Sequence, residues 1–178
     1  MSSALLPVIF APELLAKVED FDCGDEPHER ELAEWIKTES VTALARGTQV
    51  WLYATSEKEI VGFGSLGTSN WNYPDPSAKR LAVAVIPAVA IQKKWWGKPD
   101  GPREERYSAQ ILDHLILEAA KLVLAVPVLG LFVHPANVRA CKVYERSGFQ
   151  AFSRTYTDET TGVTYRSMLR LLSSAAER

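Results

Sequence analysis

One segment in the C-terminal third of the sequence holds side chains that can transfer protons. His134, Asn137 and Tyr144 fall within the run HPANVRACKVYERSGF (134–149). An imidazole can accept a proton and a phenol can supply one, which are the two halves of general acid–base catalysis. Glu145 and Asp113 could also act as a base, but both fall on the polar faces of predicted helices. These residue types indicate proton-transfer chemistry around residues 134–149.

A second segment has the residue types that bind phosphate. The run QKKWWGKPDGPREER (92–106) contains more basic than acidic residues and is interrupted by glycine and proline. Lys and Arg side chains, and backbone N–H groups exposed by glycine, are the usual ligands of an anion at a helix start. A solvated charged loop would have the same composition.

Cys23 and Cys141 are far apart without metal-ligand spacing, so we expect two reduced thiols and no metal site.

Composition excludes several classes of protein. The 178 residues suffice for one domain, predicted to span 1–178, and 47% of them are hydrophobic while 24% are charged. The net charge of −2 gives no global field that would attract nucleic acid. The N-terminal segment lacks a basic region and is interrupted by proline, so no signal peptide is predicted. No apolar run is long enough to span a membrane, and we expect a cytoplasmic protein.

The elements that must position these residues follow from periodicity. An amphipathic helix is predicted over 27–46 and a longer one over 107–126, with a short helix over 137–147 that ends at Gly148. Alternating or continuously apolar runs predict strands, at residues 6–10, 48–55, 60–66, 81–91, 128–133, 149–157 and 163–172. A loop is predicted at 70–78. This order predicts a mixed α/β domain around one sheet.

Pro87 interrupts the most apolar of these strands. The run LAVAVIPAVAI (81–91) predicts a central strand buried on both faces, but proline cannot donate a hydrogen bond to a ladder. The sequence therefore predicts a bulge at Pro87, or a place where regular pairing has ended.

The region 81–149 closely resembles the GCN5-related N-acetyltransferase (GNAT) family. The resemblance rests on six positions with the family's spacing: Asn137, Ala140, Tyr144, Glu145, Gly148 and Phe149. It implies an α+β fold with a mostly antiparallel central sheet, helices on both faces and a parallel, splayed strand pair. It also implies an enzyme that uses acetyl-CoA as cosubstrate. A plain helix ending in Gly-Phe, with Tyr144 in the core, would show the same residues.

The resemblance assigns roles around the thioester. In acetyl transfer an amine attacks the thioester carbonyl and coenzyme A leaves as a thiolate, which a nearby hydroxyl can protonate. Tyr144 matches the family's usual acid, although its hydroxyl could instead only orient the cosubstrate. Asn137 and Ala140 would lie at the cosubstrate, and Asn137 could equally be a simple helix cap. His134 is the first candidate for the base that deprotonates the amine, and a structural or substrate-lining histidine would look identical.

The cosubstrate's two halves are predicted to bind differently. In this family the strand before the basic loop pairs its free backbone groups with the pantetheine arm, and the matching positions are Ala88, Val89, Ala90 and Ile91. The phosphate loop departs from the family pattern, because Trp96 replaces Arg or Gln and Pro99 replaces a glycine. Either a longer loop binds the phosphates or binding has been lost. The first alternative uses residues of the loop and the following helix start: Lys93, Lys94, Gly97, Lys98, Gly101, Arg103, Arg106 and Ser108.

A looser resemblance extends toward the N-terminus. Segment 20–37 and the run IVGFGSL resemble the toxin acetyltransferases of toxin–antitoxin pairs, which act on aminoacyl-tRNA. The acidic net charge and the atypical loop count against that branch. Three functions follow: acetylation of a small-molecule or peptide amine, a toxin-type reaction on aminoacyl-tRNA, and a non-catalytic acetyl-CoA sensor. Aromatic residues that could line the acceptor site are Trp35, Trp71, Tyr73 and Tyr156, and homodimers are common in this family.

Overall fold

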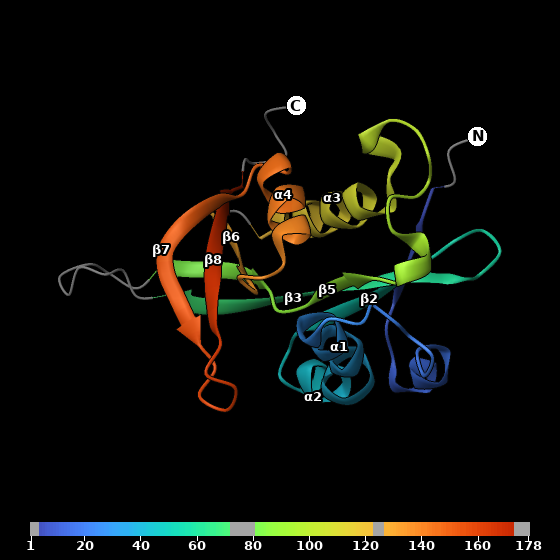
Figure 1. Ribbon diagram of the computed structural model, residues 1–178, viewed down its shortest axis with the longest axis horizontal. Coiled ribbons are helices and arrows are strands. Elements are labelled where there is room, and N and C mark those ends of the chain that lie inside the picture. The colour runs from blue at the N-terminus through green and yellow to red at the C-terminus, as the bar shows by residue number, and fades with distance from the viewer. Residues whose placement is uncertain (1–3, 72–80, 123–126, 173–178) are drawn as a thin grey trace. The chain divides into compact units, whose positions relative to one another are not determined.

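The computed structural model describes residues 4–71, 81–122 and 127–172. The chain divides into two compact units, which are treated separately below. Unit 1 comprises Met1–Leu66 and Ala88–Leu115, and unit 2 comprises Gly67–Pro87 and Ile116–Arg178. Figure 1 shows the course of the chain through the elements of both.

Unit 1 is built on an antiparallel sheet. Its strands are β1 (Leu6–Ile9), β2 (Gln49–Ala54), the first half of β3 (Ile60–Trp71), and β5 (Val89–Ile91). Leu52 of β2 lies opposite Phe63 of β3, and Phe63 lies opposite Ala90 of β5. This register stacks apolar side chains of neighbouring strands on the same face of the sheet.

Helices cover both faces of this sheet (Figure 1). On one face α1 (Pro27–Glu34), the π-helical segment η2 (Trp35–Glu39) and α2 (Ser40–Ala45) follow one another. They and the 3₁₀ turn η1 (Pro12–Lys17) pack onto a core whose buried members come from five segments of unit 1: Phe10, Val18, Phe21, Cys23, Ala33, Ile36, Val50, Leu52, Phe63, Ala88 and Ala90. Side chains of Glu26 and Glu29 form a capping box that begins α1.

The first half of α3 (Tyr107–Ala120) packs on the opposite face of the unit 1 sheet. Two glycines of β3 allow this approach. A Cβ on Gly64 would lie 2.8 Å from Leu115 Cδ1, and one on Gly62 would lie 2.5 Å from the Ala90 carbonyl oxygen. The glycines of the IVGFGSL run therefore make room for α3 and for the backbone of β5. His114 Nδ1 and the buried Tyr53 hydroxyl, 2.9 Å apart, link α3 to β2.

Unit 2 contains the second half of β3 and four further strands, whose order across the unit is β3-β4-β6-β8-β7. Their bounds are Leu81–Ile86 (β4), Val128–Val133 (β6), Gln150–Thr157 (β7) and Thr164–Leu171 (β8). Among the described strands of this unit, β4 and β6 run parallel and the other pairs are antiparallel. The expected mixed, mostly antiparallel sheet with one parallel strand pair is confirmed.

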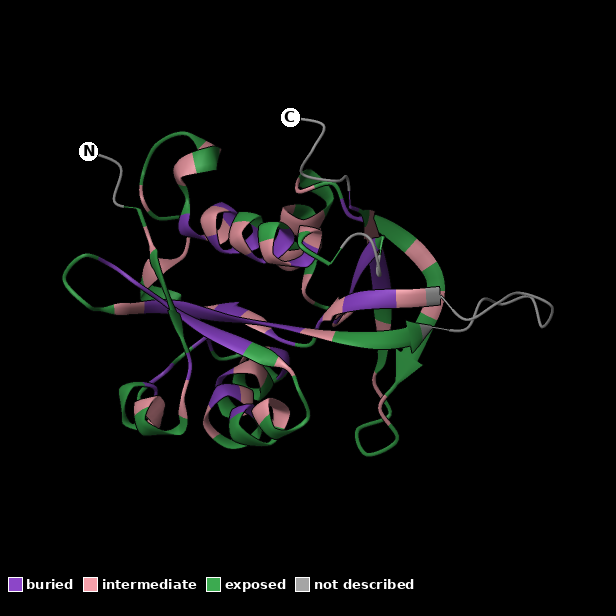
Figure 2. Cartoon of the chain, turned by 180° about the vertical axis from the view of Figure 1, so that it is seen from behind, coloured by how far each residue is buried: buried purple, intermediate pink, exposed green. Residues whose placement is uncertain are grey.

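The two faces of the unit 2 strands differ. One face carries a small cluster made only of strand residues: Val83, Val85, Val128, Phe132, Phe152 and Leu169. The intervening positions Leu129, Leu131 and Val133 are buried, as expected from alternation along β6. β7 is half-buried or exposed along its whole length (Figure 2).

The predicted elements are confirmed with three corrections. The strand predicted over 81–91 is two strands, because Pro87 separates β4 from β5. β3 continues to Trp71, so the predicted 70–78 loop is wrong for its first two residues, and 72–78 lie outside the described residues. α3 ends at Ala120 rather than near 126. None of the helices in the described part of the chain has the length and apolar character that crossing a bilayer requires.

Candidate functional site

Tyr144 lies on α4 (Val138–Arg146), whose start and end are both fixed by local bonds. Asn137 caps the helix, because its side-chain oxygen accepts the Ala140 N–H at 3.0 Å. At the other end, Arg170 of β8 donates to the Ser147 carbonyl. The cap bond uses the Ala140 N–H, so the structure accounts for Asn137 and Ala140 as parts of the helix start.

The Tyr144 ring is half-buried and meets Phe149 edge-on, with 6.0 Å between ring centroids. Burial raises the pKa of the Tyr144 hydroxyl above its ordinary value of 10.0, and the nearby Cys141 raises it further. The phenol therefore stays protonated well above neutral pH. A general acid must be protonated before it reacts, and a phenol meets this condition at neutral pH.

His134 follows β6 directly. Its Nδ1 accepts the Ala136 N–H at 3.2 Å, and its ring lies edge-on to Tyr165 at 5.5 Å. A neutral imidazole that accepts at Nδ1 carries its proton on Nε2. In this conformation His134 is thus a hydrogen-bond donor at Nε2, and its lone pair at Nδ1 is already engaged.

β5 presents one edge to β3 and the other away from it. The Ser65 N–H donates to the Ala88 carbonyl at 3.0 Å, and the Gln92 N–H donates to the Val61 carbonyl at 2.9 Å. In an antiparallel ladder bonded positions alternate, so residues 88, 90 and 92 face β3. Val89 and Ile91 consequently turn their N–H and C=O groups to the opposite edge.

Trp96 occupies part of that opposite edge. Its indole Nε1 donates to the Ile91 carbonyl at 3.1 Å. The Val89 N–H, the Val89 C=O and the Ile91 N–H have no partner within the described ranges. Of the four positions predicted to bind pantetheine, Val89 and Ile91 therefore offer backbone groups, while Ala88 and Ala90 face β3.

Ser65 on β3 is a positioning residue that the sequence did not single out. Its Oγ donates to the Ala88 carbonyl at 2.8 Å and accepts the Ala88 N–H at 2.9 Å, directly after Pro87. The hydroxyl is fully buried. The Ser65 hydroxyl supplies the hydrogen bonds with which strand pairing resumes after Pro87. The sequence signal for this role is a serine in an apolar strand that pairs with a strand interrupted by proline.

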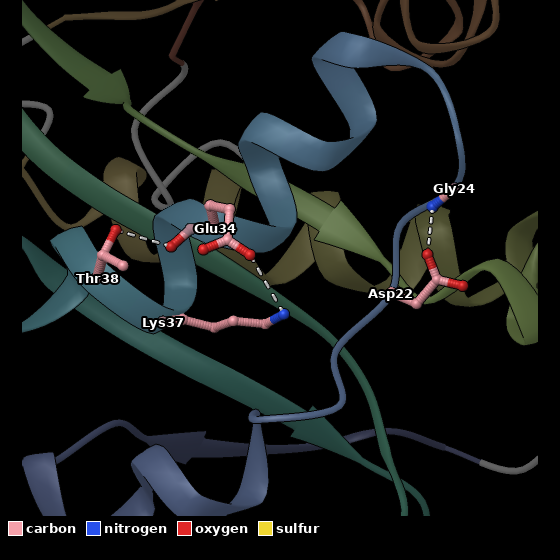
Figure 3. Close-up of polar contacts among 5 residues, drawn as sticks. All are labelled: Asp22, Gly24, Glu34, Lys37 and Thr38. Carbon is pink, nitrogen blue, oxygen red and sulfur yellow. Dashed lines mark hydrogen bonds and ion pairs between the residues drawn. The ribbon is translucent and has the colours of Figure 1, made fainter.

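The loop after β5 is tied to the segment that precedes α1. The Lys93 N–H donates to the Asp22 carbonyl at 2.8 Å, and Lys93 Nζ pairs with Asp25. Trp96 packs so closely on Gly24 that a Cβ there would lie 2.9 Å from its ring. Gly24 has φ +128°, which only glycine adopts readily, and its N–H donates to Asp22 Oδ1 at 2.8 Å (Figure 3).

The predicted phosphate-binding residues are distributed along this loop. The 3₁₀ turns η3 (Lys93–Trp95) and η4 (Arg103–Glu105) flank Gly97, a cis Lys98–Pro99 bond and Gly101. Lys94 pairs with Glu59 at 3.3 Å, and Lys98 pairs with Asp100 at 2.7 Å. Arg106 is exposed, Arg103 and Ser108 are half-buried, and Ser108 is the second residue of α3.

The helical segment between α1 and α2 contains one wide turn. In η2 the chain forms a π-helix, and Thr38 Oγ1 donates to the Glu34 carbonyl at 2.9 Å (Figure 3). Lys37 pairs with Glu34 at 3.5 Å, and Ser40 Oγ donates to the Ile36 carbonyl at 2.6 Å. Hydroxyl groups thus satisfy carbonyls within this irregular stretch, and such π-turns are frequent at functional sites.

Four aromatic rings, which we term the aromatic row, line up on the face of unit 2 that carries the cluster containing Val83 and Phe132. They belong to Phe132, Tyr156, Tyr165 and His134. Phe132 contacts Tyr156 at 5.6 Å, Tyr156 contacts its cross-strand partner Tyr165 at 6.0 Å, and Tyr165 contacts His134. Tyr156 is 52% exposed. Residues 127–172 include six Lys and Arg against three Asp and Glu, although the whole chain has 20 against 22. Segment 127–172 thus combines an aromatic row, in which Tyr156 is exposed and the other rings are half-buried, with an excess of basic residues.

The other predicted site residues have simpler places. Trp35 stacks on Phe63 at 5.6 Å and packs against the unit 1 core, so it is a packing residue. Glu145 and Asp113 are exposed, in agreement with their predicted helix faces. The Trp71 side chain and all of Tyr73 lie outside the described residues.

No protein-family model matches the sequence, and no curated protein matches it. Solved structures match over almost its whole length. AtaTR bound with AcCoA is 19% identical, covers 97% of this chain and 95% of its own, and has a TM-score of 0.65. AtaT complexed with acetyl-methionyl-tRNAfMet is 18% identical, covers 90% and 93%, and has a TM-score of 0.62.

A GNAT-family acetyltransferase from Staphylococcus aureus Mu50 is 14% identical, covers 96% of this chain and 100% of its own, and has a TM-score of 0.62. At these identities the likeness concerns the fold. The chain has the fold of GNAT-family acetyltransferases, which confirms the fold that the sequence resemblance implied.

Proposed function

We propose that the chain is an acetyl-CoA-dependent N-acetyltransferase with a primary amine as acceptor. The observation that supports this most strongly is the break at Pro87, after which β5 turns the backbone groups of Val89 and Ile91 away from β3. An extended pantetheine arm, which has its own amides, can pair with such an edge as an additional strand. The GNAT fold and the protonated Tyr144 support the same function.

The proposed reaction is direct transfer. The amine nitrogen attacks the thioester carbonyl carbon, a C–N bond forms and the C–S bond breaks. The leaving thiolate takes the proton of the Tyr144 hydroxyl, the attacking amine releases one proton to water, and Tyr144 regains its proton from water. The products are an N-acetylated amine and a free thiol.

A toxin-type reaction on aminoacyl-tRNA is the second candidate. The aromatic row and the basic residues of segment 127–172 favour it, because unpaired bases stack on aromatic rings and phosphates bind Lys and Arg. AtaT, which shares the fold, was solved with acetyl-methionyl-tRNAfMet. Acetylation of aminoacyl-tRNA that falls steeply with salt, and is lost in Tyr156→Ala, would select this candidate over small amines.

Calorimetry with acetyl-CoA, followed by thiol release with a panel of amines, tests the proposal. The panel includes small primary amines, peptides with free N-termini and aminoacyl-tRNA. Binding together with amine-dependent thiol release is expected. Binding without turnover on any amine would identify the sensor alternative, and absence of acetyl-CoA binding would defeat both.

A further inference from the structure

The lysines of the loop 92–106 are neutralised by carboxylates. Lys93 pairs with Asp25, Lys94 with Glu59 at 3.3 Å, and Lys98 with Asp100 at 2.7 Å. Asp25 and Glu59 come from segments far from the loop in sequence. With these two added to the three acidic residues of the loop itself, five acidic residues balance its five basic ones, so the formal charges cancel.

The start of α3 is also closed to an anion. Its first N–H, that of Tyr107, donates to the Lys98 carbonyl at 2.8 Å. The Ala109 and Gln110 N–H groups both donate to the Arg106 carbonyl, at 3.0 and 3.1 Å. Ser108 thus has the single N–H of this turn without a partner in the described part of the chain. A pyrophosphate site at a helix start uses several such groups together.

The family's phosphate site is therefore not reproduced by these residues, whereas the strand edge for pantetheine is. The Val89 N–H and C=O and the Ile91 N–H remain available on β5. The Trp96 indole holds the fourth group of this edge, the Ile91 carbonyl, and fixes the loop beside it. The backbone groups that remain for a cosubstrate are thus the ones that match an extended pantetheine arm.

We infer that the site recognises acetyl-pantetheine thioesters as a class and gains little from the adenosine phosphates of coenzyme A. This inference rests on the proposed function. With S-acetyl-pantetheine the balance is unchanged: the C–S bond breaks, the C–N bond of the amide forms, and pantetheine leaves as the protonated thiol. Acetyl-CoA remains a cosubstrate, and the truncated thioester is a second one.

The test compares kcat/KM for acetyl-CoA and S-acetyl-pantetheine with the same amine. Charge-assisted hydrogen bonds contribute about 1.5–3 kcal/mol each, so a phosphate site with several of them would favour acetyl-CoA about a thousandfold or more. The expected preference is below about tenfold. A larger preference would overturn the inference and leave the proposed function intact, whereas no turnover with acetyl-CoA itself would contradict the proposed function.

A gain-of-contact variant tests the cause. The double variant Glu59→Gln, Asp100→Asn releases Lys94 and Lys98 from their partners, and both lysines then become available to phosphate. The KM for acetyl-CoA should fall while that for S-acetyl-pantetheine stays constant. Glu159→Gln, which neutralises an exposed carboxylate in the turn between β7 and β8, is the matched control. An unchanged preference in the double variant would contradict carboxylate pairing as the cause.

Discussion

At the scale of single residues, protonation states distinguish the two groups predicted for catalysis. Tyr144 is protonated at neutral pH, as any phenol is, and burial raises its pKa further, so it carries the proton that a general acid must hold. His134 accepts a backbone N–H at Nδ1, so it has no lone pair ready for a proton from the amine. The family resemblance made both residues candidates, but the hydrogen bond that defines the His134 tautomer depends on the turn from His134 to Asn137.

The prediction for His134 follows from that tautomer. In His134→Gln the amide nitrogen can replace Nε2 as a donor. We therefore expect the KM for the acceptor to stay close to the parent value and the rising limb of the kcat/KM profile against pH to be retained, as measured by thiol release. Disappearance of that limb, with little change in KM, would instead identify His134 as the base.

Cys23 gives a pH dependence of stability. Burial, followed by the charges of Asp22 and Glu29, raises the pKa of this thiol from 9.0 to about 12, against a smaller opposing effect of Lys37. The folded state therefore holds a proton that the unfolded chain releases above pH 9. The contribution of this thiol to the free energy of unfolding is fully present below pH 9. It is lost as the pH rises toward 12, by up to about 1.4 kcal/mol per pH unit.

Urea unfolding between pH 8 and pH 10 measures this effect. The free energy of unfolding should decline more steeply in the parent protein than in Cys23→Ala. Parallel curves for the two proteins would show that the thiol does not titrate differently in the folded state. Cys141→Ser, at a half-buried thiol, is the control for general effects of losing a cysteine.

At the scale of elements, periodicity predicted nearly every helix and strand, and local chemistry explains the exceptions. Pro87 was visible as an interruption, but only the structure shows that the buried Ser65 hydroxyl restarts pairing beyond it. The π-turn in η2 keeps the apolar spacing of an ordinary helix, so its sequence does not reveal it. The salt bridges of Lys93 and Lys94 depend on Asp25 and Glu59, which tertiary folding brings to the loop.

The two glycines of β3 provide a matched pair of substitutions. Gly62→Ala places a Cβ against the backbone carbonyl of Ala90, whereas Gly64→Ala meets the movable end of Leu115. We expect Gly62→Ala to lower the free energy of unfolding by about 1–3 kcal/mol and to raise the KM for acetyl-CoA, because β5 is displaced. Gly64→Ala should lower the free energy of unfolding by less than Gly62→Ala does, and it should leave the KM for acetyl-CoA unchanged. Equal effects on KM would contradict the assignment of β5 to the cosubstrate.

At the scale of the whole molecule, two elements contribute residues to both compact units. β3 continues from unit 1 into unit 2, and α3 divides between Leu115 and Ile116. We expect these shared elements to make unfolding a single cooperative transition, consistent with the predicted single domain. Thermal melts followed by tryptophan fluorescence and by far-ultraviolet circular dichroism should coincide, and two separated midpoints would show that the units unfold independently.

The most direct test of acetyl transfer is a single-turnover measurement with acetyl-CoA and an accepted amine, comparing the parent protein with Tyr144→Phe. Thiol release and formation of the acetylated amine are followed together. The account predicts equal amounts of both products in the parent protein, and retained acetyl-CoA binding with a rate about 10²–10⁴-fold lower in Tyr144→Phe. Thiol release without an acetylated amine, or an unchanged rate in Tyr144→Phe, would contradict it.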